Sequence, residues 1–230
     1  MDPLVRTARV TGLLYLGLAV AGGLGFLFVR SRLFVDGDAP ATLANLVAHD
    51  ALARTGVAVE LLTVLTQTLV ALWFYRLFRS TDQFAAGAIA VFGTVNAAVV
   101  LVSAALLGTT VTLAGDPVGD NAANVQVLYL VSGALWSVGG IFFGLWLIPM
   151  GWCAIRSGRM PRALGWVLIT GGGGYVLAAF AGYLLPGAPV LADVLVVPAT
   201  VGEVWMVGYL LVRGIRRAAP TPAAAVPAVA

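Results

Sequence analysis

The sequence predicts an all-α protein, a polytopic transmembrane bundle of about six helices. Its 230 residues are 60% hydrophobic and only 10% charged, whereas soluble domains carry about 25% charged residues. The mean hydropathy is +0.99. No Asp, Glu, Lys or Arg occurs between Asp82 and Asp116, or between Asp120 and Arg156. Because about 20 apolar residues cross a bilayer as a helix, these long uncharged segments indicate membrane spans.

Charged residues mark the boundaries of the predicted spans, which cover residues 10–29, 52–75, 84–113, 125–155, 164–185 and 191–212. The third and fourth are longer than one bilayer is thick, so their ends should tilt, kink or protrude, and Pro149 is the expected kink site. The fifth ends at Pro186 and Gly187, which are typical helix stops. Residues 1–217 are therefore expected to form the transmembrane domain. The Pro/Ala-rich segment 218–230 is expected to be a disordered cytoplasmic tail.

The placement of arginine predicts the topology. All 13 basic residues are arginine, and three of them, Arg30, Arg32 and Arg54, fall on one side of the predicted membrane. The others fall on the side that holds both termini, and basic loops remain in the cytoplasm. Both termini are therefore predicted to be cytoplasmic. The arginines are dispersed between apolar runs, which argues against nucleic acid as a partner.

Few residues are available for metal or nucleophilic chemistry. The single cysteine, Cys153, excludes an intrachain disulfide and a cysteine metal cluster. The single histidine, His49, lies in a predicted outer loop with no serine partner nearby in the sequence, so neither a hydrolase triad nor a metal site is expected. The glycine run at 171–174 lacks the preceding strand and the Lys-Ser/Thr of a phosphate loop. We expect it to loosen the fifth helix or admit a bulky neighbour, and no cofactor is predicted.

The outer loop after the first span has a helical pattern of its own. Asp38 is a predicted N-cap, Pro40 falls in the first turn, and apolar residues then recur at helical spacing. This predicts a short amphipathic helix on the outer leaflet. Asp50 and Arg54, four positions apart, are expected to face one another and pair. Two interpretations remain open: a solvated surface pair, or a fixed ion pair at the mouth of a cavity.

Two glutamates lie inside predicted spans, where an ionised side chain costs about 3 kcal/mol on insertion scales. Glu203 precedes the cytoplasmic boundary at Arg213 by roughly 15 Å, which places it near mid-membrane. Glu60 precedes Arg76 by roughly 24 Å, in the outer third. Neither should face lipid. Each could carry a proton, donate a hydrogen bond to a ligand, or serve only as a neutral polar link between helices.

The predicted ligand site is a polar cavity around these two glutamates that opens outward. Polar side chains from other spans and from the outer ends of the bundle are available to line it. The candidate ligand-binding residues are Asp50, Arg54, Glu60, Asn96, Asn124, Gln126 and Glu203.

Several segments resemble a known family. They are Phe143 to Gly151, Arg156 to Gly158, Pro161 to Gly165, Gly172 to Tyr175, Asn45 to Arg54, and Gly202-Glu203. Together they are similar to an uncharacterised family of bacterial integral membrane proteins, catalogued as the domain of unknown function DUF4386. The resemblance covers nearly the whole chain and implies a six-helix bundle with polar residues at the positions of Asp50, Arg54 and Glu203. It implies no activity.

The alanine, glycine, valine and arginine bias is typical of a GC-rich bacterial genome, so the expected location is the plasma membrane of a bacterium. Three classes of function remain open. The first is a binding module that holds a lipid or small hydrophobic molecule. The second is an intramembrane enzyme that acts on an isoprenoid or lipid by proton donation from a buried glutamate. The third is a proton-coupled carrier. Besides the lipid bilayer and such a ligand no partner is predicted, and no residue pattern specifies an oligomeric state.

Overall fold

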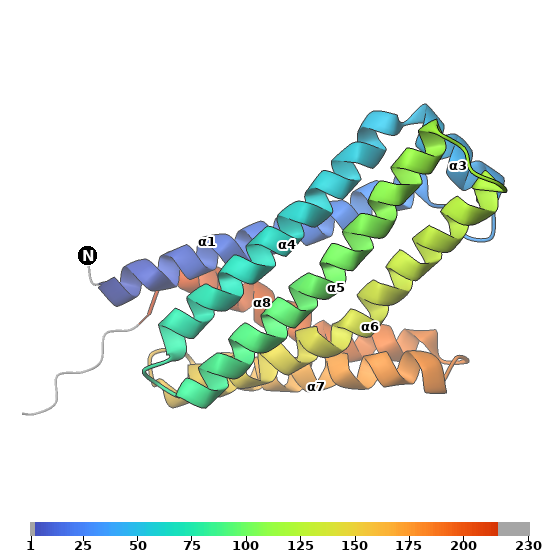
Figure 1. Cartoon of the computed structure of the whole chain (residues 1–230). Helices are drawn as coiled ribbons and strands as arrows, with labels where there is room; N and C mark the ends of the chain where they lie inside the picture. Colours follow the sequence, from blue (N-terminus) through green and yellow to red (C-terminus); the bar gives the residue numbers. More distant parts are fainter. Residues whose placement is uncertain (1–2, 216–230) are drawn as a thin grey trace, which may run out of the picture.

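The computed structural model describes residues 3–215, which form a bundle of long helices (Figure 1). Six helices are long and apolar enough to cross a membrane: Pro3–Leu33, Asp50–Phe78, Gln83–Gly115, Asn121–Arg156, Arg162–Leu184 and Val190–Val212. Each overlaps one predicted span almost completely, and no strand occurs in residues 3–215. The predicted all-α, six-span bundle is therefore confirmed. The predicted tail, 218–230, lies outside the described residues.

The first apolar helix is the only one of these six that is divided into segments. It consists of α1 (Pro3–Gly23), a π-helical segment η1 (Leu24–Arg30) and a short α2 (Ser31–Leu33). The remaining elements are α3 (Ala39–Ala48), α4 (Asp50–Phe78), α5 (Gln83–Gly115), α6 (Asn121–Arg156), α7 (Arg162–Leu184) and α8 (Pro189–Val212). The π-helical geometry of η1 has no signal in the apolar pattern and was not predicted.

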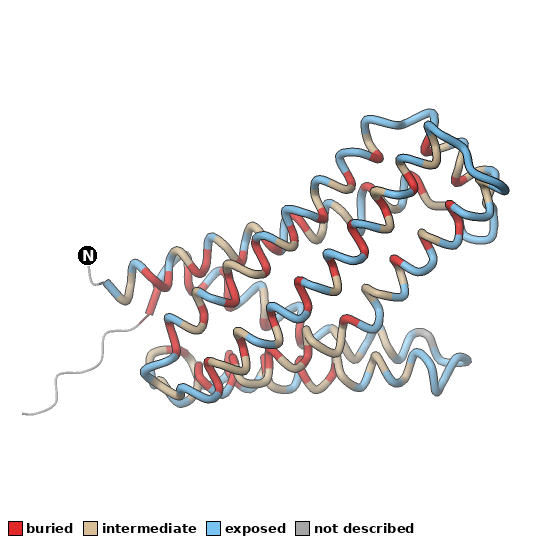
Figure 2. The backbone as a smooth tube through the Cα atoms, viewed as in Figure 1, coloured by how far each residue is buried: buried red, intermediate tan, exposed pale blue. Residues whose placement is uncertain are grey.

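Consecutive long helices pack side by side from α4 to α8, and α1 packs against both α4 and α8, which closes the bundle. The helices converge near the N-terminus, where most of the largest buried side chains lie, including Trp146, Phe74 and Met206. Toward the other end, the α7–α8 hairpin diverges from α4, α5 and α6 (Figure 1). Most of the hairpin's far end is exposed, as Figure 2 shows.

The glycine run in α7 lies between two neighbouring helix backbones. A Cβ atom added to Gly144 of α6 would lie 2.5 Å from the carbonyl oxygen of Gly172. A Cβ atom on Gly174 would meet the carbonyl oxygen of Leu195 in α8. The neighbours of the run are mainly helix backbones, although the branched side chain of Ile148 lies against Gly172, and the expectation of a loosened helix stays a prediction. The glycines let α6 and α8 approach the α7 backbone closely, which is how small residues favour helix association in a bilayer.

The predicted outer helix exists as α3. The Asp38 side chain accepts a hydrogen bond from the Ala41 N–H at 2.9 Å, and Pro40 occupies the first turn. Thr42 and Leu46 are buried, and α3 packs against α6 rather than lying free on the leaflet surface. This helix closes one end of the bundle, together with the buried Leu33 and Val125.

Asp82 caps α5 and also contacts α6. Its carboxylate accepts hydrogen bonds from the Ala85 N–H at 3.1 Å, the Trp152 indole N–H at 3.1 Å and the Arg156 guanidinium at 2.9 Å. The Ala85 N–H is the main cause that lowers the pKa of Asp82 from its usual range, with the Trp152 hydrogen bond next. A carboxyl group whose pKa is depressed by folding stabilises the fold above its unfolded pKa and loses this contribution as the pH falls.

Asp82→Asn is therefore expected to lower the melting temperature slightly at pH 7, since asparagine retains the capping oxygen but not the charge. The difference from the wild type should shrink below about pH 4, where the unfolded carboxyl begins to protonate, and disappear below the native pKa. Thermal unfolding in detergent across this range measures it. Arg156→Gln, which removes the ion pair and the contact of the guanidinium with the Trp152 ring but leaves the cap, should show a smaller pH-dependent difference. If the difference in melting temperature between Asp82→Asn and the wild type persists unchanged to low pH, the charge of Asp82 does not stabilise the fold.

Candidate ligand-binding site

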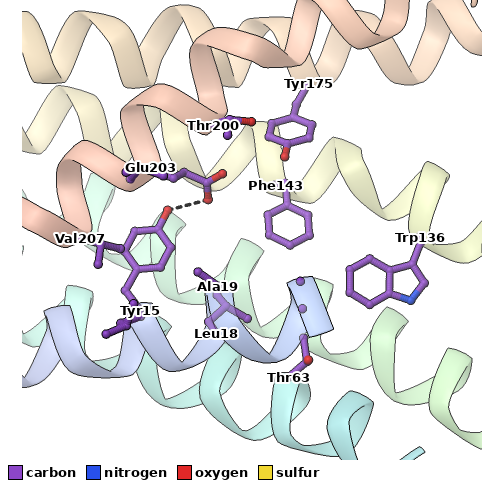
Figure 3. Close-up of a pocket in the computed structure, with 14 residues that line it drawn as sticks. Tyr15, Leu18, Ala19, Thr63, Trp136, Phe143, Tyr175, Thr200, Glu203 and Val207 are labelled. Carbon is purple, nitrogen blue, oxygen red and sulfur yellow. Dashed lines mark hydrogen bonds between the residues drawn. The ribbon is translucent and has the colours of Figure 1, made fainter. Parts of the chain in front are cut away.

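A cavity of about 340 Å³ lies where the α7–α8 hairpin diverges from the rest of the bundle (Figure 3). Its lining comes mainly from α1, α6, α7 and α8 and is mostly apolar, as in Leu18, Ala19, Val204 and Val207. Glu203 is the only acidic or basic residue among the described residues that line it. The cavity is therefore a hydrophobic site with one ionisable group.

Glu203 is oriented by Tyr15. The Tyr15 hydroxyl donates a hydrogen bond of 2.6 Å to Oε1 of Glu203, drawn as the dashed line in Figure 3. The second carboxyl oxygen has no hydrogen-bond partner among residues 3–215. Tyr15 is itself fixed, because its ring packs edge-on against Phe74 and Trp146, each with ring centres 5.5 Å away. The carboxyl group thus has one oxygen held in place and one available to a ligand.

Aromatic rings form another side of this cavity. Phe143 and Tyr175 stack with ring centres 5.8 Å apart, and Trp136 lies beyond them along α6 (Figure 3). Thr200 of α8 and Tyr175 of α7 also line this cavity (Figure 3). The combination of one carboxyl group with several aromatic faces can bind an apolar molecule that carries a single polar or charged group.

A second cavity, of about 370 Å³, adjoins the first between α6, α7 and α8. Trp136 and Tyr175 line both cavities, so these two rings lie where the cavities meet. Ser137, Tyr183 and Asp193 contribute to the second cavity only. We call the two cavities together the hairpin cleft.

Glu60 does not line the hairpin cleft. Its Oε1 atom accepts hydrogen bonds from the Trp136 indole N–H at 3.1 Å and from the Ser103 hydroxyl at 3.3 Å. Ser103 exchanges a hydrogen bond of 2.8 Å with Ser132, which also accepts one of 3.1 Å from Arg30. This chain of contacts joins α4, α5, α6 and η1. It also holds Trp136, a residue of the cleft, in position.

Arg30 was expected to mark the outer end of the first span, but η1 directs its side chain into the bundle. The guanidinium donates to the backbone oxygen of Tyr129 as well as to Ser132. The rings of Phe26, Phe34 and Tyr129 surround it at 5.6–5.7 Å. Arg30 and Glu60 also line a small cavity of about 20 Å³, which is the size of a single water molecule.

Asp50 and Arg54 form the predicted i, i+4 ion pair, with an N–O distance of 2.8 Å. Their side chains are 54% and 67% exposed, respectively, and neither lines the hairpin cleft. This geometry agrees with the solvated surface pair, the first of the two interpretations.

The predicted amides lie apart from the two glutamates. Asn124 donates to the backbone oxygen of Val118 at 2.8 Å, and Gln126 donates to that of Val35 at 3.1 Å, so both hold loops at the start of α6. Asn96 is buried in α5, facing Gly139 of α6. Of the candidate residues only Glu203 lines the hairpin cleft, while Glu60 contacts its Trp136.

Sequence reasoning missed Tyr15, Tyr175 and Asp193 as residues of this region. Tyr15 and Tyr175 sit inside uncharged runs, and their side of the helix is set by packing that no local pattern reveals. Asp193 lies at the start of the last predicted span, 191–212. Its position close to the turn at Pro186 and Gly187 could have indicated a site residue, because a charged residue at the end of a helical hairpin can face the groove between the two helices.

Six apolar helices around an apolar cleft with a carboxyl group inside define the class: a multi-pass membrane protein. The chain belongs to the DUF4386 family, since the model of this domain of unknown function matches residues 10–214. The predicted resemblance is thus confirmed. No curated protein and no solved structure matches the chain.

Proposed function

We propose that the protein is a binding module of the bacterial plasma membrane that holds a lipid or small hydrophobic molecule in the hairpin cleft. The observation that carries this proposal is the cavity of about 340 Å³, which is mostly apolar and contains a single carboxyl group. Small-molecule sites have volumes of about 300–1,000 Å³ and combine apolar walls with a few polar groups. The preformed Tyr15–Glu203 hydrogen bond supports a fixed orientation for the polar end of the ligand.

The arginine distribution supports an orientation with both termini in the cytoplasm. The α7–α8 hairpin end then faces outward, and the cleft opens in the outer half of the membrane. A ligand could therefore enter from the outer leaflet between α1 and α8 without leaving the bilayer.

A second candidate function is an enzyme that acts on an isoprenoid or lipid by proton donation from Glu203. The observation that favours it is the group of aromatic residues around the carboxyl, Trp136, Phe143 and Tyr175. Aromatic faces stabilise cations and could stabilise a carbocation formed by protonation of an alkene. This candidate differs from the binding module in one measurable way, which is that it changes the lipid composition of the host.

Gly22→Leu tests the proposal by filling the cavity. Gly22 lines the cavity, and a Cβ atom there would meet nothing within 4 Å, so the larger side chain should project into the ligand space without disturbing the fold. We expect a ligand that co-purifies stoichiometrically with the wild type to fall at least about tenfold, because overfilling a packed site costs about 1–3 kcal/mol. Mass spectrometry of lipids extracted from the purified protein gives the measurement.

Gly208→Leu is the matched control. Its Cβ atom also meets nothing within 4 Å, but Gly208 lines neither part of the hairpin cleft. This variant should retain the ligand. Equal ligand content in both variants, or no stoichiometric molecule in the wild type, would contradict the binding module. A new isoprenoid or lipid product in the expressing host, lost in Glu203→Gln, would favour the enzyme.

A further inference from the structure

The charges that line the hairpin cleft are all of one sign. Glu203 lines its first cavity and Asp193 its second, and among the described residues no arginine lines either. The chain contains no lysine. A carboxylate in a low-dielectric environment without a positive partner is costly. Either protonation of the carboxylate or a positive group on the ligand removes this cost.

Arg30 does not supply the missing positive charge. Its guanidinium is held by Ser132 and the Tyr129 backbone oxygen, and Glu60 is the acidic group that acts on it electrostatically. Asp193 has no hydrogen bond or ion pair with another residue in 3–215, and Glu203 has only the neutral Tyr15 hydroxyl. The acids of the cleft are therefore not neutralised by the described part of the chain.

Aromatic rings accompany these acids. Trp136 and Tyr175 lie at the junction of the two cavities, Phe143 stacks on Tyr175 in the first, and Tyr183 lines the second. The faces of tryptophan and tyrosine rings attract cations, and they recognise quaternary ammonium groups in particular. A carboxylate beside several aromatic faces thus favours an ammonium group over a neutral or anionic one.

We infer that the ligand of the hairpin cleft is a cationic amphiphile, with an alkylammonium nitrogen between Glu203 and the aromatic rings and an apolar chain along the remaining apolar lining. This inference rests on the proposed function of the cleft as a binding site and names the chemical class of its ligand. Asp193, which is exposed near the hairpin end, makes the entrance negative and attracts cations toward it.

The test compares three probes with the same chain: decyltrimethylammonium, decanol and decyl sulfate. Each radiolabelled probe is titrated into the full-length protein in phosphatidylcholine nanodiscs, and binding to empty nanodiscs is subtracted. The wild type is expected to bind the ammonium at least about tenfold more tightly than decanol. This factor corresponds to the combined attraction of the ammonium to the aromatic faces and to the carboxylate in a site without water. Decyl sulfate should not bind above the empty nanodiscs.

Glu203→Gln should lose most of the preference for the ammonium and keep only the part that the aromatic rings supply, while its retained decanol binding shows that it is folded. Asp193→Asn should weaken ammonium binding only about twofold to threefold, as expected for a peripheral, partly screened charge. Asp116→Asn, which removes an acid that lines neither cavity, should leave binding unchanged.

Equal affinity of the wild type for the ammonium and decanol would overturn this inference but leave the proposed function standing. Selectivity that is undiminished in Glu203→Gln would also overturn it. Binding of none of the probes would overturn both.

Discussion

Gly174→Ala is expected to lower the free energy of unfolding by about 2 kcal/mol or more, the upper part of the range for overpacking. The added methyl group would meet the carbonyl oxygen of Leu195, which belongs to the α8 backbone. A backbone atom cannot rotate away as a side chain can, so the two helices must separate. Denaturant titration in detergent micelles, followed by circular dichroism, measures the change.

Gly173→Ala is the control from the same glycine run. Its Cβ atom would meet nothing within 4 Å, and alanine favours a helix over glycine by up to about 1 kcal/mol. This variant should be as stable as the wild type or slightly more so. If both variants lose the same stability, the run acts through helix flexibility and not through contact between α7 and α8.

Glu60→Leu is expected to destabilise the protein by about 2–4 kcal/mol, because the buried Ser103 hydroxyl and the half-buried Trp136 indole lose their acceptor. The Arg30 guanidinium also loses its opposing charge, and an uncompensated buried charge is costly. Thermal unfolding and the yield of monodisperse protein after solubilisation both measure the loss.

Glu60→Gln separates hydrogen bonding from charge. Glutamine keeps an oxygen that can accept from both donors and has nearly the same shape, so its loss should be at most about half that of the leucine variant. Equal losses in the two variants would mean that the charge opposite Arg30, and not the acceptor, stabilises this part of the bundle.

The sequence was sufficient to predict the helices because a bilayer restricts the backbone to conformations that form all of their hydrogen bonds internally. Every N–H and C=O in hydrocarbon needs an internal partner, so an uncharged run such as 84–113 can cross only as a helix. The same physics indicated Glu203 and Glu60, since an acid in such a run needs a polar or enclosed environment. The α3 cap at Asp38 was predictable because its contacts are local.

The relative positions of the two glutamates were not predictable. Glu203 lines the cleft only because α7 and α8 diverge from α6, and that angle depends on backbone contacts between residues far apart in sequence, such as Gly144 and Gly172. Asn124 and Gln126 looked like interior residues, yet each hydrogen-bonds a loop at the end of α6. A polar residue near the end of a span can face either environment, and hydropathy does not distinguish them.

The π-helical segment η1 has a consequence for the order in which the protein assembles. A π-helix is rare and needs support from its surroundings, and here Arg30 is held by Tyr129 and Ser132, which follow it by 99 and 102 residues. During synthesis the first span enters the membrane long before those partners exist. We therefore expect it to insert as an ordinary α-helix and to adopt the π-helical winding once α6 is present, which would make the final geometry of the first span a late event in biogenesis.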